Sequence, residues 1–312
     1  MDLKLAFLGT PDFAVPTLEA IAAKHHVAAV FTQPDRPKGR GGQLAAPPVK
    51  EAAQRLNLAV HQPNRIRQPE VVDFLGSLSL DAMVVVGYGQ IIPQSIINIP
   101  PLGIINVHAS LLPKYRGAAP IQWAIANGES STGVTTMQID AGLDTGAMLL
   151  NWETPIGPVE TAPQLSARLA AAGADLLLKT LNGLRDGSIH PEPQDSSEAT
   201  LAPILMKDDG RIDWTWTAQK IHCRLRGFDP WPGAWTSFRG QTLHIRAARP
   251  TGGTATAAPG SLVIDNRRLL AACGESTLLE LLELQQEGRK RIPTEAFLNG
   301  QRVVHNERLG DS

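Results

Sequence analysis

An asparagine and a histidine two positions apart are the side chains best suited to chemistry in this sequence. Asn106 and His108 follow the apolar residues 102–105, which predict a buried strand ending in a loop. In an extended backbone, side chains two positions apart point the same way, so an amide and an imidazole would share one side. The amide can bond an oxygen that gains negative charge, and the imidazole can transfer a proton near neutral pH. The pair favours acyl transfer, although two satisfied polar residues at a strand end would give the same pattern.

The residues around this pair extend it into a longer string. Asn-Val-His-Ala-Ser-Leu-Leu-Pro at 106–113, continued by Tyr-Arg-Gly at 115–117, resembles the signature of formyltransferases that use 10-formyltetrahydrofolate. Ala-Gly-Leu-Asp-Thr-Gly at 141–146 resembles their second signature. Residues 7–13 and 33–41 are similar to the members of that family that act on tRNA. The resemblance runs through both halves of the chain and implies a formyltransferase fold.

A catalytic unit of Asn106, His108 and Asp144 follows from this resemblance. Taken alone, a loop aspartate between Gly142 and Gly146 is more often a turn former or a helix cap than a catalyst. In the family pattern, the aspartate bonds the imidazole and fixes its tautomer. We therefore expect Asp144 to lie beside His108.

The resemblance also implies a pocket for the pterin ring of the folate. It would be lined by the glycine turn that follows the apolar strand at 83–86 and by the loop that follows His108. Glycines in the turn would let a flat ligand approach the backbone, whereas a plain turn is the alternative interpretation. The expected folate-binding residues are Gly87, Tyr88, Gly89, Gln90, Ile91, Ser110, Leu111, Leu112 and Pro113.

A long connection rich in proline and glycine, residues 33–48, carries three cations. Loops of this kind usually span a few residues, so we expect either a mobile surface loop or a functional element. The resemblance implies that it reaches the acceptor stem of a tRNA. The expected contacts are Arg36, Lys38 and Arg40, with Arg40 as the residue tied to tRNA recognition.

Strand and helix patterns alternate from the first residues onward. Apolar runs at 3–8 and 27–32 flank a helical pattern, which predicts a βαβ unit. We therefore expect an α/β fold with a Rossmann-like, mostly parallel sheet and helices on both faces. The first turn lacks Gly-x-Gly-x-x-Gly, so a dinucleotide site is unsupported.

The composition changes after the first half of the chain, and we expect two domains. The resemblance implies that residues 1–189 form the formyltransferase catalytic domain, and we expect the polar, proline-bearing residues 190–207 to form a linker. Residues 208–312 contain several short strands, which indicate a small barrel; the resemblance implies an OB-like β-barrel that binds tRNA. They hold 14 Lys and Arg against 12 Asp and Glu. The expected tRNA contacts are Arg289, Lys290 and Arg291, although a basic run is often only a solvated face.

The bulk composition excludes several classes of protein. Hydrophobic residues make up 43% and charged residues 19%, with a net charge of −1, which is ordinary for a soluble globular protein. No apolar stretch is long enough to span a bilayer. Cys223 and Cys273 are widely separated and the histidines form no ligand constellation, so we expect neither a disulfide framework nor a metal. The chain opens directly on a strand pattern without a signal peptide, so we expect a cytoplasmic protein, and we expect a monomer.

Three functions compete. We expect transfer of the formyl group of 10-formyltetrahydrofolate to the free amino group of initiator methionyl-tRNA, for translation initiation. Another folate-dependent formyltransferase, acting on an amino sugar nucleotide or a purine precursor, would share the signature around His108. The basic residues 33–48 favour tRNA, and residues 9–13 do not form the phosphate-cradling glycine loop of the purine enzyme. A non-catalytic RNA-binding protein would not need the intact Asn106, His108 and Asp144.

Overall fold

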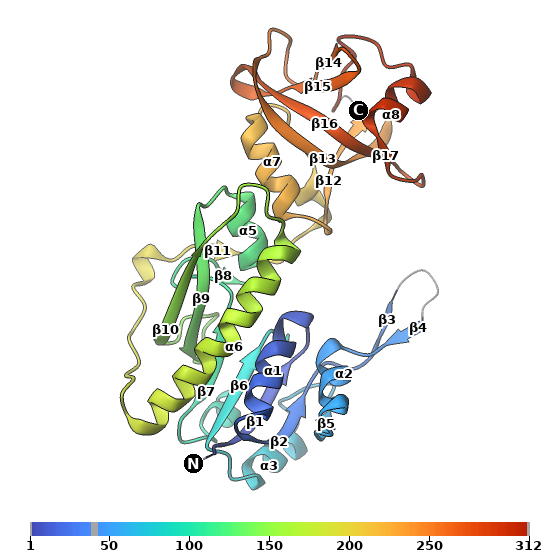
Figure 1. Cartoon of the computed structure of the whole chain (residues 1–312). Coiled ribbons are helices and arrows are strands. Elements are labelled where there is room, and N and C mark those ends of the chain that lie inside the picture. Colours follow the sequence, from blue (N-terminus) through green and yellow to red (C-terminus); the bar gives the residue numbers. More distant parts are fainter. Residues whose placement is uncertain (1, 39–42, 311–312) are drawn as a thin grey trace. The chain divides into compact units, whose positions relative to one another are not determined.

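The computed structural model describes residues 2–38 and 43–310 of the chain (Figure 1). They divide into two units by their internal contacts. The first comprises Met1–Pro120, Ser131–Pro155 and Gln164–Pro203; the second comprises Ile121–Ser130, Ile156–Pro163 and Ile204–Ser312. The expected domain limits at 189 and 208 stay predictions.

A seven-stranded sheet forms the centre of the first unit, in the order β10-β9-β7-β6-β1-β2-β5. The five strands from β7 to β5 are parallel, whereas β9 pairs antiparallel with both β7 and β10. The mostly parallel sheet expected from the sequence is confirmed. Its strands are β1 Lys4–Gly9, β2 His26–Phe31, β5 Val60–His61, β6 Ala82–Val86, β7 Ile104–His108, β9 Ser131–Gln138 and β10 Met148–Pro155.

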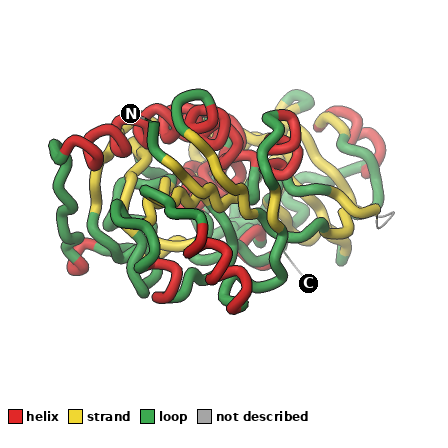
Figure 2. The backbone as a smooth tube through the Cα atoms, turned by 90° about the horizontal axis from the view of Figure 1, so that it is seen from below, coloured by secondary structure: helices red, strands yellow, loops and turns green. Residues whose placement is uncertain are grey.

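Helices cover both faces of this sheet (Figures 1 and 2). Leu75 of α3 and Ile96 of α4 pack into one apolar core with Ile104 of β7. On the opposite face, Gly173 of α6 packs so closely that an added Cβ would lie 2.8 Å from Val107 Cγ1. The helices of this unit are η1 Asp12–Ala14, α1 Val15–Ala22, α2 Pro48–Arg55, α3 Pro69–Ser77, α4 Gln94–Ile97, α6 Ala162–Asp186 and η2 Ser196–Glu198.

The connection predicted at 33–48 contains a β-hairpin. Strand β3 (Arg36–Lys38) pairs antiparallel with β4 (Gln43–Ala45), with Pro37 opposite Leu44. These two strands were not predicted from the sequence. Strands of three residues are too short to show a period of two, and their pairing uses backbone groups that leave no side-chain pattern. Arg40 lies outside the described residues.

Residues after α6 pair with strands of the first unit. Strand β11 (Leu201–Ala202) pairs parallel with β8 (Arg116–Gly117), and Glu192 forms a bridge with Met148. The polar composition of residues 190–207 predicted a linker. Strands of two residues are too short to show the alternating pattern from which a strand is predicted. Residues 192–202 are thus hydrogen bonded to the part of the chain that carries the signature motifs.

The second unit contains an antiparallel sheet in the order β12-β13-β16-β15-β14, with β17 paired to β16. Ile221 of α7, Phe297 of α8 and Leu281 of β16 share its apolar core. The expected C-terminal antiparallel domain is confirmed. Its elements are α5 Pro120–Ala126, η3 Lys207–Gly210, α7 Ala218–Gly227, β12 Ala234–Phe238, β13 Gln241–Thr254, β14 Leu262–Asp265, β15 Arg268–Ala272, η4 Gly274–Ser276, β16 Thr277–Gln286, β17 Ile292–Pro293 and α8 Thr294–Gln301.

The C-terminal segment spans the two edge strands of this sheet. Leu309 forms a bridge with Phe238 at the end of β12, and Arg308 forms one with Ser261 just before β14. The described strand order is open between β12 and β14, so the closed OB-like barrel stays a prediction.

Candidate active site

Strand β7 presents the two polar side chains that the sequence singled out. Asn106 lies between Val85 of β6 and Met137 of β9, and His108 pairs with Thr135 of β9. Because side chains alternate along a strand, Asn106 and His108 lie on one face of the sheet. Both are buried, with 9% and 6% of their surface exposed. They stand near the carboxyl ends of the parallel strands, the edge where α/β sheets carry their sites.

The Asp144 carboxylate joins this pair. Its Oδ1 accepts a hydrogen bond from Asn106 Nδ2 at 3.4 Å, and its Oδ2 lies 3.7 Å from His108 Nδ1. The same Oδ2 accepts a bond from the Gly117 amide at 2.9 Å. The structure therefore brings together the three residues of the two motifs, although Asn106 and Asp144 are 38 positions apart in the sequence.

The hydrogen-bond partner of the second ring nitrogen of His108 determines which nitrogen carries a hydrogen. His108 Nε2 lies 2.9 Å from the Tyr115 carbonyl oxygen. A carbonyl only accepts, so Nε2 carries a hydrogen and the Nδ1 side faces the Asp144 carboxylate. A proton on Nδ1 would lie between the imidazole and that carboxylate. The site can thus hold the imidazolium form with both N–H groups opposite oxygen atoms.

The loop that carries Asp144 is tightly turned. Asp144 has a φ of 51°, in the left-handed region that few residues other than glycine adopt. The Asp140 carboxylate closes the turn by accepting bonds from the Gly142 amide and the Thr145 hydroxyl. At Gly146, a Cβ would lie 1.9 Å from the Gln138 carbonyl oxygen, so only glycine fits.

The loop after His108 is held by hydroxyl groups. Thr135 Oγ1 donates to the Ser110 carbonyl at 2.8 Å and accepts from the Leu112 amide at 3.1 Å. The Ser110 hydroxyl donates to the Lys114 carbonyl at 2.6 Å. Ser110 and Leu112 are buried, whereas Leu111 and Pro113 are half-buried. These bonds give the loop one shape, and its contact with folate stays a prediction.

Both glycines of the turn after β6 have a positive φ. Gly87 and Gly89 have φ values of 57° and 83°. The Tyr88 carbonyl between them accepts bonds from Thr10 Oγ1 at 3.0 Å and from Gln33 Nε2 at 3.1 Å. A ligand at this turn would therefore meet a backbone that is already held in place.

Three side chains of this turn differ in what they can contact. Tyr88 is 1% exposed and points into the core, where burial raises the pKa of its phenol to about 12. Gln90 Oε1 accepts the Ile66 amide at 2.6 Å, so this side chain holds a neighbouring loop. Ile91 is 91% exposed. Of these three side chains, Ile91 is the one open to a ligand.

The candidate tRNA contacts lie in two places. In the hairpin, Arg36 is exposed and its Nη2 donates to Gln33 Oε1 at 3.3 Å; Lys38 is in β3, and Arg40 falls outside the described residues. In the second unit, residues 289–291 are all exposed and follow β16. Arg291 forms an ion pair with Glu283, whereas no ion pair among the described residues includes Arg289 or Lys290.

The sequence did not identify the residue whose side chain bonds the backbone of the Asp144 loop. Gln194 bonds the Arg116 guanidinium and also the carbonyls of Asp144 and Gly146. It lies 50 positions from Asp144 in a polar stretch that looked like a linker. Neither periodicity nor a motif could have identified it.

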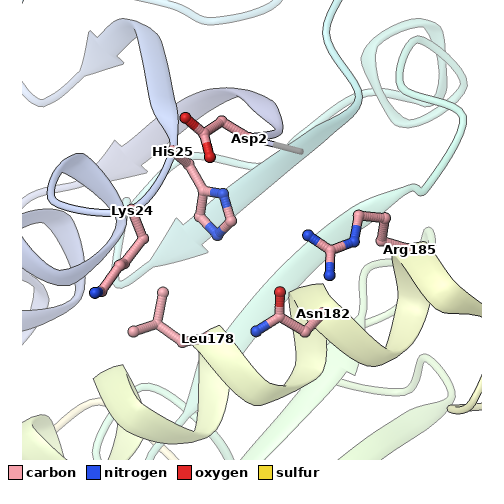
Figure 3. A pocket seen from close by; sticks show the side chains of 6 residues that line it. All are labelled: Asp2, Lys24, His25, Leu178, Asn182 and Arg185. Carbon is pink, nitrogen blue, oxygen red and sulfur yellow. The ribbon is translucent and has the colours of Figure 1, made fainter.

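A pocket at the opposite edge of the sheet takes no part in this arrangement (Figure 3). Its lining residues lie before β1 and β2 and near the end of α6, at the amino ends of those strands. Burial lowers the pKa of His25, whose Nδ1 accepts the Leu3 amide at 3.3 Å. The pocket is lined by Asp2, Lys24, His25, Leu178, Asn182 and Arg185.

Within residues 2–38 and 43–310, no three His, Cys, Asp or Glu residues are grouped so that they could hold a metal ion. None of the helices described there is long and apolar enough to cross a membrane.

Comparison with known proteins covers nearly the whole chain. Residues 3–181 match the family described as Formyl transferase, and residues 204–302 match Formyl transferase, C-terminal domain. Methionyl-tRNA formyltransferase of Solibacter usitatus (strain Ellin6076) is 64% identical over 310 residues, 99% of each chain. That of Koribacter versatilis (strain Ellin345) is 58% identical over 310 residues, 98% of each chain.

A solved structure shares the fold at low sequence identity. WlaRD, a sugar 3N-formyl transferase crystallised in the presence of dTDP and 5-N-formyl-THF, has a TM-score of 0.69 and 18% identity. The alignment covers 93% of this chain and 100% of that chain.

Proposed function

Because the chain belongs to the methionyl-tRNA formyltransferase family along nearly its whole length, we propose that it transfers the formyl group of 10-formyltetrahydrofolate to the amino group of initiator methionyl-tRNA. The product is N-formylmethionyl-tRNA, which is used in translation initiation. The observation that carries this proposal is the Asp144 carboxylate held against both Asn106 and His108, in a chain that matches relatives of that name from end to end.

The reaction exchanges one C–N bond for another, without oxidation or reduction. The unprotonated amine of the methionyl ester attacks the formyl carbon, a new C–N bond forms, and the carbonyl electron pair moves onto oxygen. When this tetrahedral intermediate collapses, the bond between the carbon and N10 breaks. The attacking nitrogen loses a proton and N10 gains one. The enzyme must therefore stabilise one negative oxygen and manage one proton.

We assign to Asn106 the stabilisation of the negative formyl oxygen. Its amide group has two N–H donors, of which one bonds Asp144 Oδ1. The other can bond the formyl oxygen, and a neutral donor that is already oriented stabilises that oxygen most when it carries charge.

We assign the proton transfer of the reaction to His108 and Asp144. The Nε2–H of His108 is held by the Tyr115 carbonyl, so proton transfer would use the Nδ1 side, which faces the carboxylate. Asp144 then keeps the ring in place and balances the positive charge of the imidazolium.

The folate cosubstrate is assigned to the glycine turn and the loop after His108. The turn offers a fixed backbone at Gly87 and Gly89 and an exposed Ile91 side chain. The loop of residues 110–113 is fixed by Thr135 next to His108. A flat pterin needs such walls, with apolar surface and a few oriented polar groups.

The tRNA is assigned to Arg36 and Lys38 of β3, to Arg40, and to the basic run at 289–291. Exposed cations supply the salt-dependent attraction to an RNA backbone. An amino sugar nucleotide is the alternative acceptor. The sugar formyl transferase WlaRD shares the fold at 18% identity, whereas the relatives at 58% and 64% are named for methionyl-tRNA.

One assay tests the proposal directly. The protein is incubated with 10-formyltetrahydrofolate and charged initiator methionyl-tRNA, and the formylated product is separated after deacylation. Parallel reactions contain a nucleotide-linked amino sugar or uncharged tRNA. Formylation of methionyl-tRNA alone supports the proposal, and formylation of the amino sugar with no product on tRNA would replace it.

We also propose that the protein acts in the cytoplasm as a monomer. Light scattering at micromolar concentration, with and without tRNA, would measure the oligomeric state, and a dimer mass without tRNA would contradict it.

A further inference from the structure

The side-chain amide of Gln194 touches the Asp144 loop and the Arg116 guanidinium at once. Gln194 Nε2 donates to the Asp144 carbonyl at 2.8 Å and to the Gly146 carbonyl at 2.7 Å. Gln194 Oε1 accepts from Arg116 Nε at 3.0 Å and from Arg116 Nη2 at 2.7 Å. All four bonds have ordinary hydrogen-bond lengths, and together they use both ends of the amide.

Arg116 determines which way this amide is turned. The Arg116 side chain is buried at 7% exposure, and in the described part of the chain no carboxylate pairs with it. A guanidinium only donates, so it requires the oxygen end of Gln194. The nitrogen end is thereby directed at the two carbonyls, which only accept. The arrangement is complementary in one orientation of the amide.

The Asp144 loop needs such support because its backbone is strained. Asp144 has a φ of 51°, and non-glycine residues hold such a conformation only where the surroundings fix it. Gln194 bonds the carbonyl of Asp144 itself and that of Gly146 two residues later. These bonds fix the peptide planes that follow the Asp144 side chain and hence the direction of its carboxylate.

The same stretch of chain also holds the other partner of His108. The Tyr115 amide donates to Thr200 Oγ1 at 2.9 Å, and the Arg116 amide donates to the Thr200 carbonyl at 2.9 Å. Tyr115, with a φ of 60°, supplies the carbonyl that accepts from His108 Nε2. Residues 194–202 therefore hold the backbone on both sides of the imidazole.

We propose that Gln194 is a positioning residue for formyl transfer: it holds the Asp144 carboxylate against Asn106 and His108 by bonding the carbonyls of Asp144 and Gly146. This inference rests on the proposed function of the three residues. Gln194 acts through Asp144 and does not touch the reacting atoms. Its effect falls on kcat, because the carboxylate is required during the reaction and not for binding either substrate.

Two substitutions separate the two ends of the amide. Gln194→Glu keeps an acceptor for Arg116, removes the donor, and sets a negative oxygen opposite two carbonyls. Gln194→Met keeps the length and removes both functions. The matched controls are Gln54→Glu and Gln54→Met, because Gln54 is exposed on α2. Each variant is assayed for kcat and for KM of both substrates, and its thermal unfolding is measured.

The expected result is a fall in kcat of about tenfold or more in both Gln194 variants, with KM values within about twofold of the parent. Gln194→Glu should unfold near the parent temperature, because its carboxylate still pairs with Arg116. Hydrogen exchange gives a readout that does not depend on activity. The amides of residues 140–147 should exchange faster in Gln194→Glu than in the parent. The Gly117 amide should do the same, because it donates to the Asp144 carboxylate. In Gln54→Glu, the exchange of all these amides should not change.

The outcomes are separable. A parent kcat in Gln194→Met would overturn the inference, as would unchanged exchange of residues 140–147 in Gln194→Glu. An increase in KM with an unchanged kcat would also overturn it, because Gln194 would then act in binding. If the parent protein formylates no tRNA, the proposed function fails, while the exchange experiment still decides whether Gln194 holds the Asp144 loop.

Discussion

Removing the Asn106 amide should slow formyl transfer by roughly a hundredfold. The formyl oxygen becomes negative in the tetrahedral intermediate, and one oriented donor to such an oxygen lowers the barrier by about 3 kcal/mol. Since about 1.4 kcal/mol corresponds to a factor of ten in rate, Asn106→Ala should lower kcat by about two orders of magnitude. The KM for the folate should change little, because the bond strengthens mainly in the transition state.

The folded state should lose little in the same variant. The bond from Asn106 Nδ2 to Asp144 Oδ1 is long, at 3.4 Å, and the carboxylate keeps its 2.9 Å bond from the Gly117 amide. Loss of one such bond costs about 1 kcal/mol of unfolding free energy or less. A large loss of activity with a small loss of stability would therefore point to the reaction and not to the fold.

Single-turnover formylation with saturating substrates measures this effect without interference from product release. Asn151→Ala is the matched control, because Asn151 is an exposed asparagine on β10 of the same sheet. It should react at the parent rate. If Asn106→Ala stayed within about threefold of the parent, the assignment of Asn106 to the negative oxygen would be wrong.

Three further outcomes are expected. Replacing the cations at 289–291 with Gln should weaken tRNA binding and flatten its salt dependence in filter binding; an unchanged slope would place the RNA contact elsewhere. Arg40→Leu should leave folate binding intact and lower kcat/KM for initiator methionyl-tRNA by about tenfold or more; formylation at the parent rate would refute this. Hydrogen bonds from Arg268 and Arg249 hold the pKa of the buried Glu280 at about 2, below its ordinary value, so its stabilising effect is present above about pH 4 and is lost as the pH falls toward 2. Glu280→Gln should cost about 1–2 kcal/mol at pH 7, discounted for the exposed arginines, and much less near pH 2 in urea unfolding; an equal cost at both pH values would contradict this.

The position of Asn106 beside His108 followed from the sequence because it depends on local geometry alone. Residues two positions apart on a strand lie on the same face, and the apolar run before Asn106 identified the strand. Asp144 required the family pattern, since a loop aspartate carries no periodic signal. The parallel sheet followed from the alternation of apolar runs and helical patterns.

The parts that escaped prediction depend on backbone pairing or on single long-range contacts. The hairpin of β3 and β4 and the pairing of β8 with β11 involve three and two residues in each strand. Gln194 acts through an amide whose partners lie 48, 50 and 78 positions away. Composition described its surroundings correctly as polar, but composition does not identify the groups that a polar side chain bonds.

The return of residues 192–202 to the first unit limits where the chain can be divided. A fragment that ends at 189 would retain the three side chains proposed as catalytic, yet the buried Arg116 guanidinium would lose its acceptor. The backbone around Tyr115 and Asp144 would lose its partners as well. A buried charge left without a partner is among the costly defects of a folded protein. Such a truncated protein should therefore be poorly soluble and inactive, whereas one that ends at Pro203 keeps every contact that residues 192–202 make with the Asp144 loop.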